Sequence, residues 1–186
     1  MKNGTQKTGL RGFTLLETLV AVLILVMSIT GPLIIAQKGL TTTLIAKDQV
    51  TAYFLAQDAV EYIHFKRDNA CLNAASPCNS TAAWLSTLSN CTSSTGATTC
   101  TVDTTENDPV AITTCNGVCP NINYDSTTGR YSYTTGTKTP FVRTITITAP
   151  VPGNNDEAAV VVTVSWTDSG AKLRSVTTKE DIFNWE

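Results

Sequence analysis

The chain has 186 residues, a formal net charge of −2 and only 15% charged residues. This length suffices for one ordinary domain and a membrane anchor, and the absence of a basic balance argues against nucleic acid as a ligand. The first twelve residues hold three of the thirteen basic side chains and no acidic one: Lys2, Lys7 and Arg11. The rest of the chain carries ten basic and fifteen acidic residues, a formal charge of −5.

The longest apolar stretch runs from Phe13 to Ala36 and predicts a membrane-spanning helix. At the helical rise of about 1.5 Å per residue, it is long enough to cross a hydrocarbon core of roughly 30 Å. Glu17 lies inside this stretch, where a charge costs about 2.5–3.5 kcal/mol at the membrane centre and less near an interface. The carboxylate therefore needs a partner. Gly31 and Pro32 lie further along, and the proline predicts a kink because it removes a backbone hydrogen bond.

The order of the basic residues and the apolar stretch predicts how the chain is oriented and processed. Under the positive-inside rule the basic start stays in the cytoplasm, and everything after the span lies outside. A secretory signal peptide would carry an A-x-A-like cleavage site after its apolar part, and this stretch has none. We therefore expect a cut between Gly12 and Phe13. It would create an amine on Phe13, close to Glu17, as the partner that the carboxylate needs.

The residues around this expected cut resemble a known family. Gly12-Phe-Thr-Leu-Leu-Glu17 before an apolar helix is similar to the leader of type IV pilins and type II secretion pseudopilins. The stretch 52–61 and Val164-Ser-Trp166 also look like minor pilins and pseudopilins. The resemblance implies that prepilin peptidase cuts after Gly12 and N-methylates Phe13, and that Glu17 acts in assembly. It further implies an α+β, ladle-shaped fold with a long N-terminal helix and a C-terminal antiparallel sheet.

These patterns divide the chain into five parts: a cleaved cytoplasmic leader (1–12), a transmembrane or filament-core helix (13–36), a continuation of that helix packed on the head (37–67), a loop region rich in Cys, Thr, Ser and Asn (68–122), and an antiparallel sheet (123–186).

The helical continuation predicts one buried stripe, formed by apolar residues three and four positions apart: Ala46, Val50, Tyr53, Ala56, Val60 and Ile63. Phe54 and Phe65 fall on its polar face and spoil the amphipathicity. The stripe should pack under the sheet, because neither surface can be buried alone.

All six cysteines lie in the loop region, which predicts three disulfides formed in an oxidising compartment. Six cysteines allow 15 pairings, and the sequence does not select one. The local spacing suggests Cys71 with Cys78, Cys91 with Cys100, and Cys115 with Cys119. A zinc site would need short paired spacings or several histidines, so we expect no metal and no cofactor. A short helix is expected at residues 82–88, and loops elsewhere in this region.

The last region predicts an antiparallel meander, because its segments alternate and short turns connect them. The expected strands are residues 130–134, 141–148, 158–166 and 172–178. The apolar tail of Ile182, Phe183 and Trp185 should pack down.

We expect no enzyme. His64 is the only histidine and lies beside the helical stripe, and the chain has no GxSxG, HExxH or phosphate-binding glycine loop.

The leading hypothesis is a structural subunit, a minor pilin or pseudopilin, held in the bacterial inner membrane and then assembled into an extracytoplasmic filament. The resemblance does not separate a type IV pilus from a type II secretion filament. The implied partners are prepilin peptidase, other pilin or pseudopilin subunits, an inner-membrane assembly platform and the lipid bilayer. The alternative is a surface-displayed adhesin or DNA-uptake module on a pilin-type anchor, and only this alternative involves nucleic acid. A third possibility, an anchored domain that never polymerises, leaves Glu17 unexplained.

Overall fold

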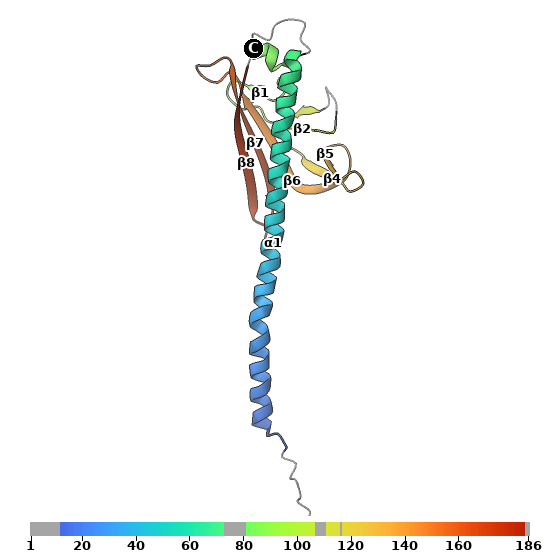
Figure 1. Ribbon diagram of the computed structural model, residues 1–186, viewed down its shortest axis with the longest axis vertical. Coiled ribbons are helices and arrows are strands. Elements are labelled where there is room, and N and C mark those ends of the chain that lie inside the picture. The colour runs from blue at the N-terminus through green and yellow to red at the C-terminus, as the bar shows by residue number, and fades with distance from the viewer. Residues whose placement is uncertain (1–11, 73–80, 107–110, 116, 185–186) are drawn as a thin grey trace, which may run out of the picture. The chain divides into compact units, whose positions relative to one another are not determined.

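The computed structural model describes residues 12–72, 81–106, 111–115 and 117–184, and it consists of two compact units, Met1–Leu44 and Ile45–Glu186. These residues form one long N-terminal helix, two short helical turns and a sheet of eight strands (Figure 1). The α+β class expected from the sequence is confirmed.

The first unit holds the start of helix α1, Leu15–Leu72. Thr14 takes the N-cap position: its carbonyl accepts a hydrogen bond from the Thr18 N–H (3.2 Å), and its hydroxyl oxygen accepts one from the Glu17 N–H (3.3 Å). The helix continues through Gly31 and Pro32 as α-helix. The kink expected there stays a prediction.

In the second unit α1 ends at Leu72, five residues later than the expected end at 67. No glycine or proline interrupts residues 68–72, and the Asn69 side chain donates to the carbonyl of Phe65 one turn earlier (2.9 Å). The boundary between the helix and the loop region is therefore corrected.

The buried face of α1 in this unit consists of small and branched residues: Ala52, Leu55, Ala56, Ala59, Val60 and Ile63. The expected stripe was right for its last three members and wrong for Ala46, Val50 and Tyr53, which are exposed. The steps of three and four residues that start at Ala46 therefore do not all follow the buried face of the helix. Alanines, and not the tyrosine, occupy much of the buried face of the helix.

The sheet is built around its longest strand, β6, Thr137–Thr148. Along one edge β6 pairs with β7, Glu157–Thr167, which pairs with β8, Leu173–Phe183; this is the antiparallel meander that the sequence predicts. Along its other edge β6 pairs with three short strands in turn, of which β1 is parallel. The five short strands are β1 (Thr92–Ser93), β2 (Cys100–Val102), β3 (Ile112–Thr114), β4 (Asn121–Asp125) and β5 (Arg130–Ser132).

The first expected strand of the meander takes a different place. β5 pairs with β4, and β4 lies between β5 and β6. The Asp125 carboxylate accepts hydrogen bonds from the Thr127 N–H and the Thr128 hydroxyl (2.8 and 3.0 Å) and so closes the β4–β5 hairpin. Gly136, at φ +98°, passes so close to the Tyr124 carbonyl that a side chain would collide with it. This tight approach brings β6 alongside β4.

The region 68–122 contains more regular structure than the loops expected there. Besides the tail of α1, it holds α2 (Thr81–Trp84) and the 3₁₀ turn η1 (Ser86–Leu88), close to the expected short helix. It also contributes β1, β2, β3 and the start of β4. These strands are only two to five residues long, so they produce no periodicity that the sequence alone would reveal.

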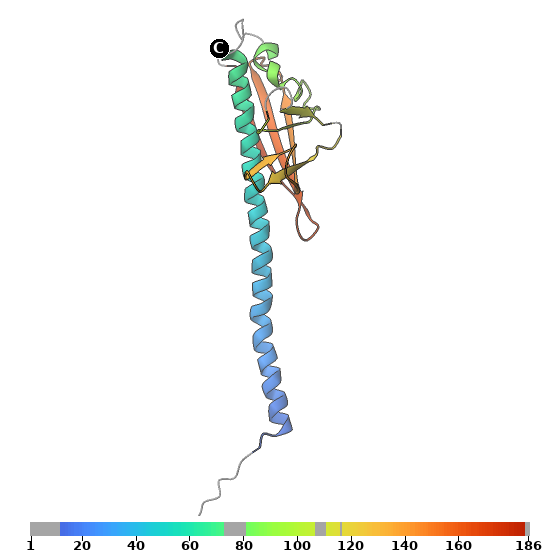
Figure 2. The ribbon, with the colours of Figure 1, turned by 90° about the vertical axis from the view of Figure 1, so that its right-hand side faces the viewer.

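The core lies between α1 and the sheet face turned toward it (Figure 2). Alternate residues of β7 point into it, as expected from their pattern: Ala158, Val160, Val162, Val164 and Trp166. Trp84 and Leu88, from α2 and η1, are fully buried in the same core. Ile182 of the apolar tail is buried as expected, and Trp185 lies outside the described residues.

Candidate functional site

The sequence places the candidate assembly site at the start of α1, and the structure gives its local geometry. Glu17 is the third residue of the helix, and its backbone N–H is bonded to Thr14. Thr14-Leu-Leu-Glu17 has the sequence of a capping box, in which an acidic side chain at this position also suits the positive end of the helix dipole. Phe13, the expected new terminus, precedes the cap and is exposed.

The polar side chains that follow in the apolar stretch are satisfied within the helix itself. The hydroxyl groups of Thr18, Ser28 and Thr30 donate to backbone carbonyls three residues earlier, over 2.8–3.1 Å. A hydroxyl bonded in this way can enter hydrocarbon at little cost. Glu17 differs, because its carboxylate has no hydrogen bond or ion pair among the described residues.

Every described residue of the first unit is exposed, including large apolar side chains such as Leu15, which is 83% exposed. This helix is long and apolar enough to cross a membrane. Exposed apolar surface on this scale requires a bilayer or other chains to cover it. The first unit therefore combines a surface that must be buried with one carboxylate that would need a counter-charge there.

In the second unit, the most deeply buried charge belongs to Arg143 of β6, which is 1% exposed. Its guanidinium donates to the Leu55 carbonyl (2.8 Å), the Asp58 carboxylate (3.0 Å) and the Val102 carbonyl. The apolar stripe expected from the sequence does not include Asp58, and the sequence analysis did not single out Arg143. A lone arginine in an alternating strand is the only sequence signal, and it does not identify the partner.

A second polar cluster lies around Asp103, just after β2. Burial raises the pKa of this carboxyl, but hydrogen bonds from the hydroxyl of Thr105, the N–H groups of Tyr133 and Thr105, and the hydroxyl of Ser132 lower it more. The net pKa lies below its ordinary value. Burial raises the pKa of the neighbouring Tyr133, so this phenol stays neutral. The cluster joins the end of β2 to the end of β5 and the residue after it, which gives Asp103 a structural role.

A groove of about 570 Å³ opens between α1 and β5. Its lining residues are Thr51, Phe54, Leu55, Asp58, Thr104, Thr105, Arg130 and Tyr131. Asp58 is already bonded to Arg143 and to the Thr104 hydroxyl (3.1 Å). Arg143 and Thr104 thus hold the Asp58 carboxylate in a structural contact, and no group of metal ligands was found in the described part of the chain.

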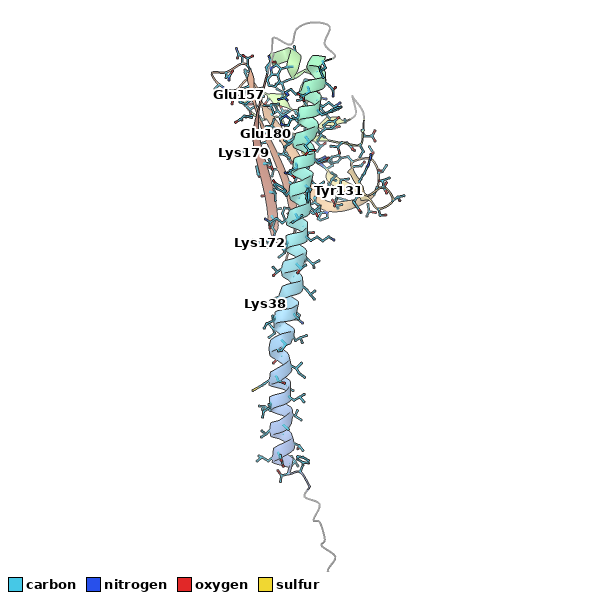
Figure 3. The ribbon with its side chains drawn as sticks, in the orientation of Figure 1. Lys38, Tyr131, Glu157, Lys172, Lys179 and Glu180 are labelled. Carbon is cyan, nitrogen blue, oxygen red and sulfur yellow. A yellow bond between two sulfur atoms is a disulfide. The ribbon has the colours of Figure 1, made fainter. Side chains whose placement is uncertain are left out.

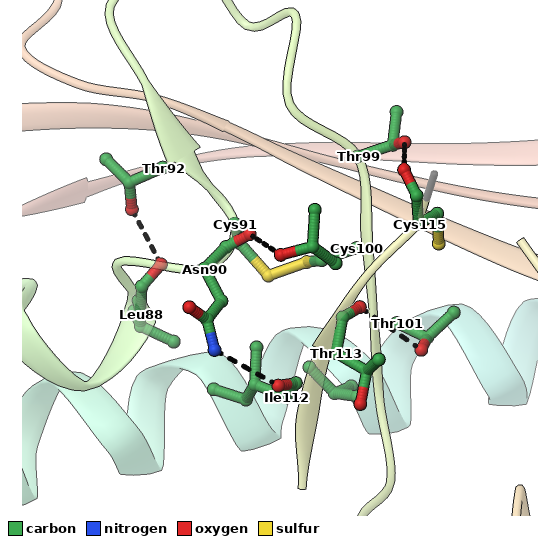
Figure 4. The surroundings of a disulfide bond; sticks show 12 residues. Leu88, Asn90, Cys91, Thr92, Thr99, Cys100, Thr101, Ile112, Thr113 and Cys115 are labelled. Atoms are coloured by element: carbon green, nitrogen blue, oxygen red, sulfur yellow. Dashed lines mark hydrogen bonds between the residues drawn. A yellow bond between two sulfur atoms is a disulfide. The ribbon is translucent and has the colours of Figure 1, made fainter. Parts of the chain in front are cut away.

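The cysteines support the structure of the second unit. Cys91 is bonded to Cys100 and Cys115 to Cys119, the pairs that the local spacing suggests. Cys91 and Cys100 are fully buried, and hydrogen bonds surround them: Asn90 donates to the Ile112 carbonyl, and Thr92 to the Leu88 carbonyl (Figure 4). The third expected pair, Cys71 with Cys78, stays a prediction, because Cys78 lies outside the described residues. The leader residues before Gly12 lie outside them as well.

His64 lies on α1, where the sequence placed it. Its Nε2 atom is 2.9 Å from a Glu180 carboxylate oxygen, so it joins the helix to β8. This contact gives His64 and Glu180 a structural role.

No protein-family model, curated protein or solved structure matches this chain. The functional argument therefore rests on the residues and contacts described above.

Proposed function

We propose that this chain is a structural subunit of a type IV pilus or type II secretion filament, with the character of a minor pilin or pseudopilin. The observation that carries the proposal is the Glu17 carboxylate: it has no partner among the described residues, in an apolar stretch where the hydroxyl groups of Thr18, Ser28 and Thr30 are bonded to the helix backbone. An anchor that only spanned a membrane would gain from this residue no more than its favourable interaction with the helix dipole, and it would bear the cost of the charge.

In this proposal the chain is made as a precursor in the bacterial inner membrane, with its basic leader in the cytoplasm and its second unit outside. Prepilin peptidase cuts between Gly12 and Phe13 and methylates the new terminus. The Phe13 amine of one subunit then pairs with Glu17 of a neighbour, and the apolar surface of the first unit is buried between subunits. The contact joins two different patches, so it can repeat from subunit to subunit along an open filament.

The long helix and the antiparallel sheet of the second unit agree with the ladle-shaped subunits of that family. The disulfides and the Asp103 cluster give the second unit the stability that a domain outside the cell needs. The loop region supplies core residues through Cys91, Cys100 and Ile112. A role in stability thus explains the loop region without an adhesin or a DNA receptor.

The pairing is tested with Glu17→Gln, which keeps the size of the side chain and removes only the charge. We expect normal cleavage and at least a tenfold loss of sheared filaments, measured by immunoblot. The control is Glu61→Gln on an exposed position of the same helix, which should assemble normally. Wild-type filament yield from Glu17→Gln would refute the pairing.

Processing is tested separately by N-terminal mass spectrometry of the full chain taken from membranes. The wild-type protein should begin at methylated Phe13, and Gly12→Leu should keep its leader. A wild-type chain that retains Met1 to Gly12 contradicts the proposal at its first step.

A further inference from the structure

We propose that the free edge of β8 binds an extended strand of a different polypeptide, which continues the sheet by one strand. β8 pairs with β7 over all eleven of its residues without a shift of register. It pairs with no other strand in the described part of the chain and lies at the outer side of the sheet (Figure 1). Unpaired backbone donors and acceptors in such a row are complementary to another strand.

Hydrogen bonds at the two ends of β8 show which backbone groups face outward. The Asn184 N–H donates to the Asp156 carbonyl (2.9 Å), and the Asp168 N–H donates to the Lys172 carbonyl (3.0 Å). Even-numbered residues of β8 therefore turn their backbone groups toward β7, and odd-numbered residues turn theirs outward, because these groups alternate in an antiparallel pair. The outward-facing groups belong to Leu173, Ser175, Thr177, Lys179, Asp181 and Phe183.

The last of these residues supports the assignment independently. The Phe183 carbonyl accepts a hydrogen bond from the Arg67 side chain of α1 (3.5 Å) and so points away from β7. α1 covers the edge at this end. From Leu173 to Asp181, five outward N–H groups and five carbonyls form the proposed binding edge.

Natural proteins protect such edges with prolines, bulges and charged side chains, lysine above all. β8 has no proline and no bulge. The charged side chains on its even-numbered residues have partners within the chain: Arg174 donates to Asp168 (2.6 Å), and Glu180 contacts His64. Figure 3 shows Lys179 and Glu180 along this side of the second unit. On the outward-facing residues, Lys179 and Asp181 have opposite charges, so the edge favours an uncharged strand of small or β-branched residues.

A second copy of this chain fits the edge poorly. The strands at the ends of the main strand order, β3 and β5, have three residues each and would leave most of the edge unpaired. Two β8 strands could pair around a two-fold axis, but that contact closes on itself and does not repeat along an assembly of identical subunits. The occupant is therefore a strand of another kind of chain, a step that rests on the filament function proposed above.

The test uses two neighbouring threonines as a matched pair. Thr177→Pro removes an outward N–H and keeps every backbone hydrogen bond to β7, losing only the contact between the Thr177 and Thr163 hydroxyls (3.1 Å). Thr178→Pro removes a backbone N–H that donates to β7. Hydrogen exchange at single-residue resolution is compared between the full chain in native membranes and the purified chain in detergent. We expect the amides of Ser175, Lys179 and Asp181 to exchange at least tenfold more slowly in native membranes. Thr177→Pro should abolish this difference in exchange, and it should lower the unfolding temperature less than Thr178→Pro, which breaks a backbone hydrogen bond to β7.

Equal exchange of these amides in both preparations overturns the proposal. So does slow exchange that arises in the purified chain as its concentration rises and a dimer forms, because the occupant is then a second copy. Glu17→Gln separates this inference from the filament proposal: protected amides in a variant that forms no filaments support the β8 edge on their own.

Discussion

The guanidinium of Arg143 lies 3.0 Å from the carboxylate of Asp58 and donates a further hydrogen bond to the carbonyl of Leu55, one turn earlier on the same helix. Through the Val102 carbonyl it also reaches β2. One side chain of β6 thus joins three elements that are far apart in the sequence. A charge buried this deeply is tolerated because a carboxylate and two carbonyls replace the water it has lost.

Asp58→Ala should lower the free energy of unfolding by about 1–3 kcal/mol, because the buried guanidinium loses its carboxylate. Glu61→Ala is the matched control on the same helix, and its effect should stay within about 0.5 kcal/mol. Urea unfolding of the full chain in detergent, followed by the fluorescence of its buried tryptophans, measures both. Equal stabilities of the two variants would show that the contact contributes nothing.

The Asp103 cluster predicts a loss of stability in acid. The pKa of this carboxyl is lowered in the folded chain, while in the unfolded chain it takes the ordinary value of about 3.9. The ionised carboxylate therefore stabilises the fold above about pH 4, and this stabilisation disappears as the pH falls through the lowered pKa. Asp103→Asn should be less stable than wild type at pH 7, and its stability should fall less between pH 5 and pH 2.

The matched control for this experiment is Asp156→Asn, because Asp156 is exposed and its carboxylate makes no hydrogen bond among the described residues. Its urea midpoints should follow those of the wild type at every pH. A pH profile of Asp103→Asn parallel to that of the wild type would count against the cluster as the source of the acid sensitivity.

The sequence predicted the parts of the fold that depend on long, regular patterns. The apolar stretch from Phe13 and the alternation in β6, β7 and β8 were enough for the helix and the meander. The short strands were missed because each is held by pairing with distant residues, as Cys100 is with Thr114 and Ile145. The Arg143–Asp58 contact was missed for the same reason, since its partners are 85 residues apart.

The candidate assembly site was accessible from the sequence because it is local. Glu17 and the hydroxyl groups after it lie within one helix, so their neighbours follow from helical spacing. The edge of β8 needed the structure, because which of its backbone groups face outward depends on its pairing with β7.

The two described disulfides should differ in their contribution to stability. Replacing Cys91 and Cys100 by alanine should cost about 3 kcal/mol from chain entropy alone, and the buried position of both residues adds a packing loss. Replacing Cys115 and Cys119, which close a shorter loop, should cost about 2 kcal/mol. Thermal unfolding of both double variants gives the order. A larger loss for the second pair would contradict the role assigned to the first pair in the core.

The cap of α1 provides a way to separate two roles of Glu17. The bond from its N–H to the Thr14 hydroxyl uses the backbone, so Glu17→Gln retains it, whereas Thr14→Val removes it and Thr14→Ser keeps it. Losing this cap should cost about 1 kcal/mol and speed the exchange of the Glu17 amide about fivefold in micelles, as NMR can measure. If Glu17 acts through its charge, Thr14→Val should still assemble and Glu17→Gln should not. Equal loss of filaments in both variants would mean that the start of the helix, and not the carboxylate, is what assembly requires.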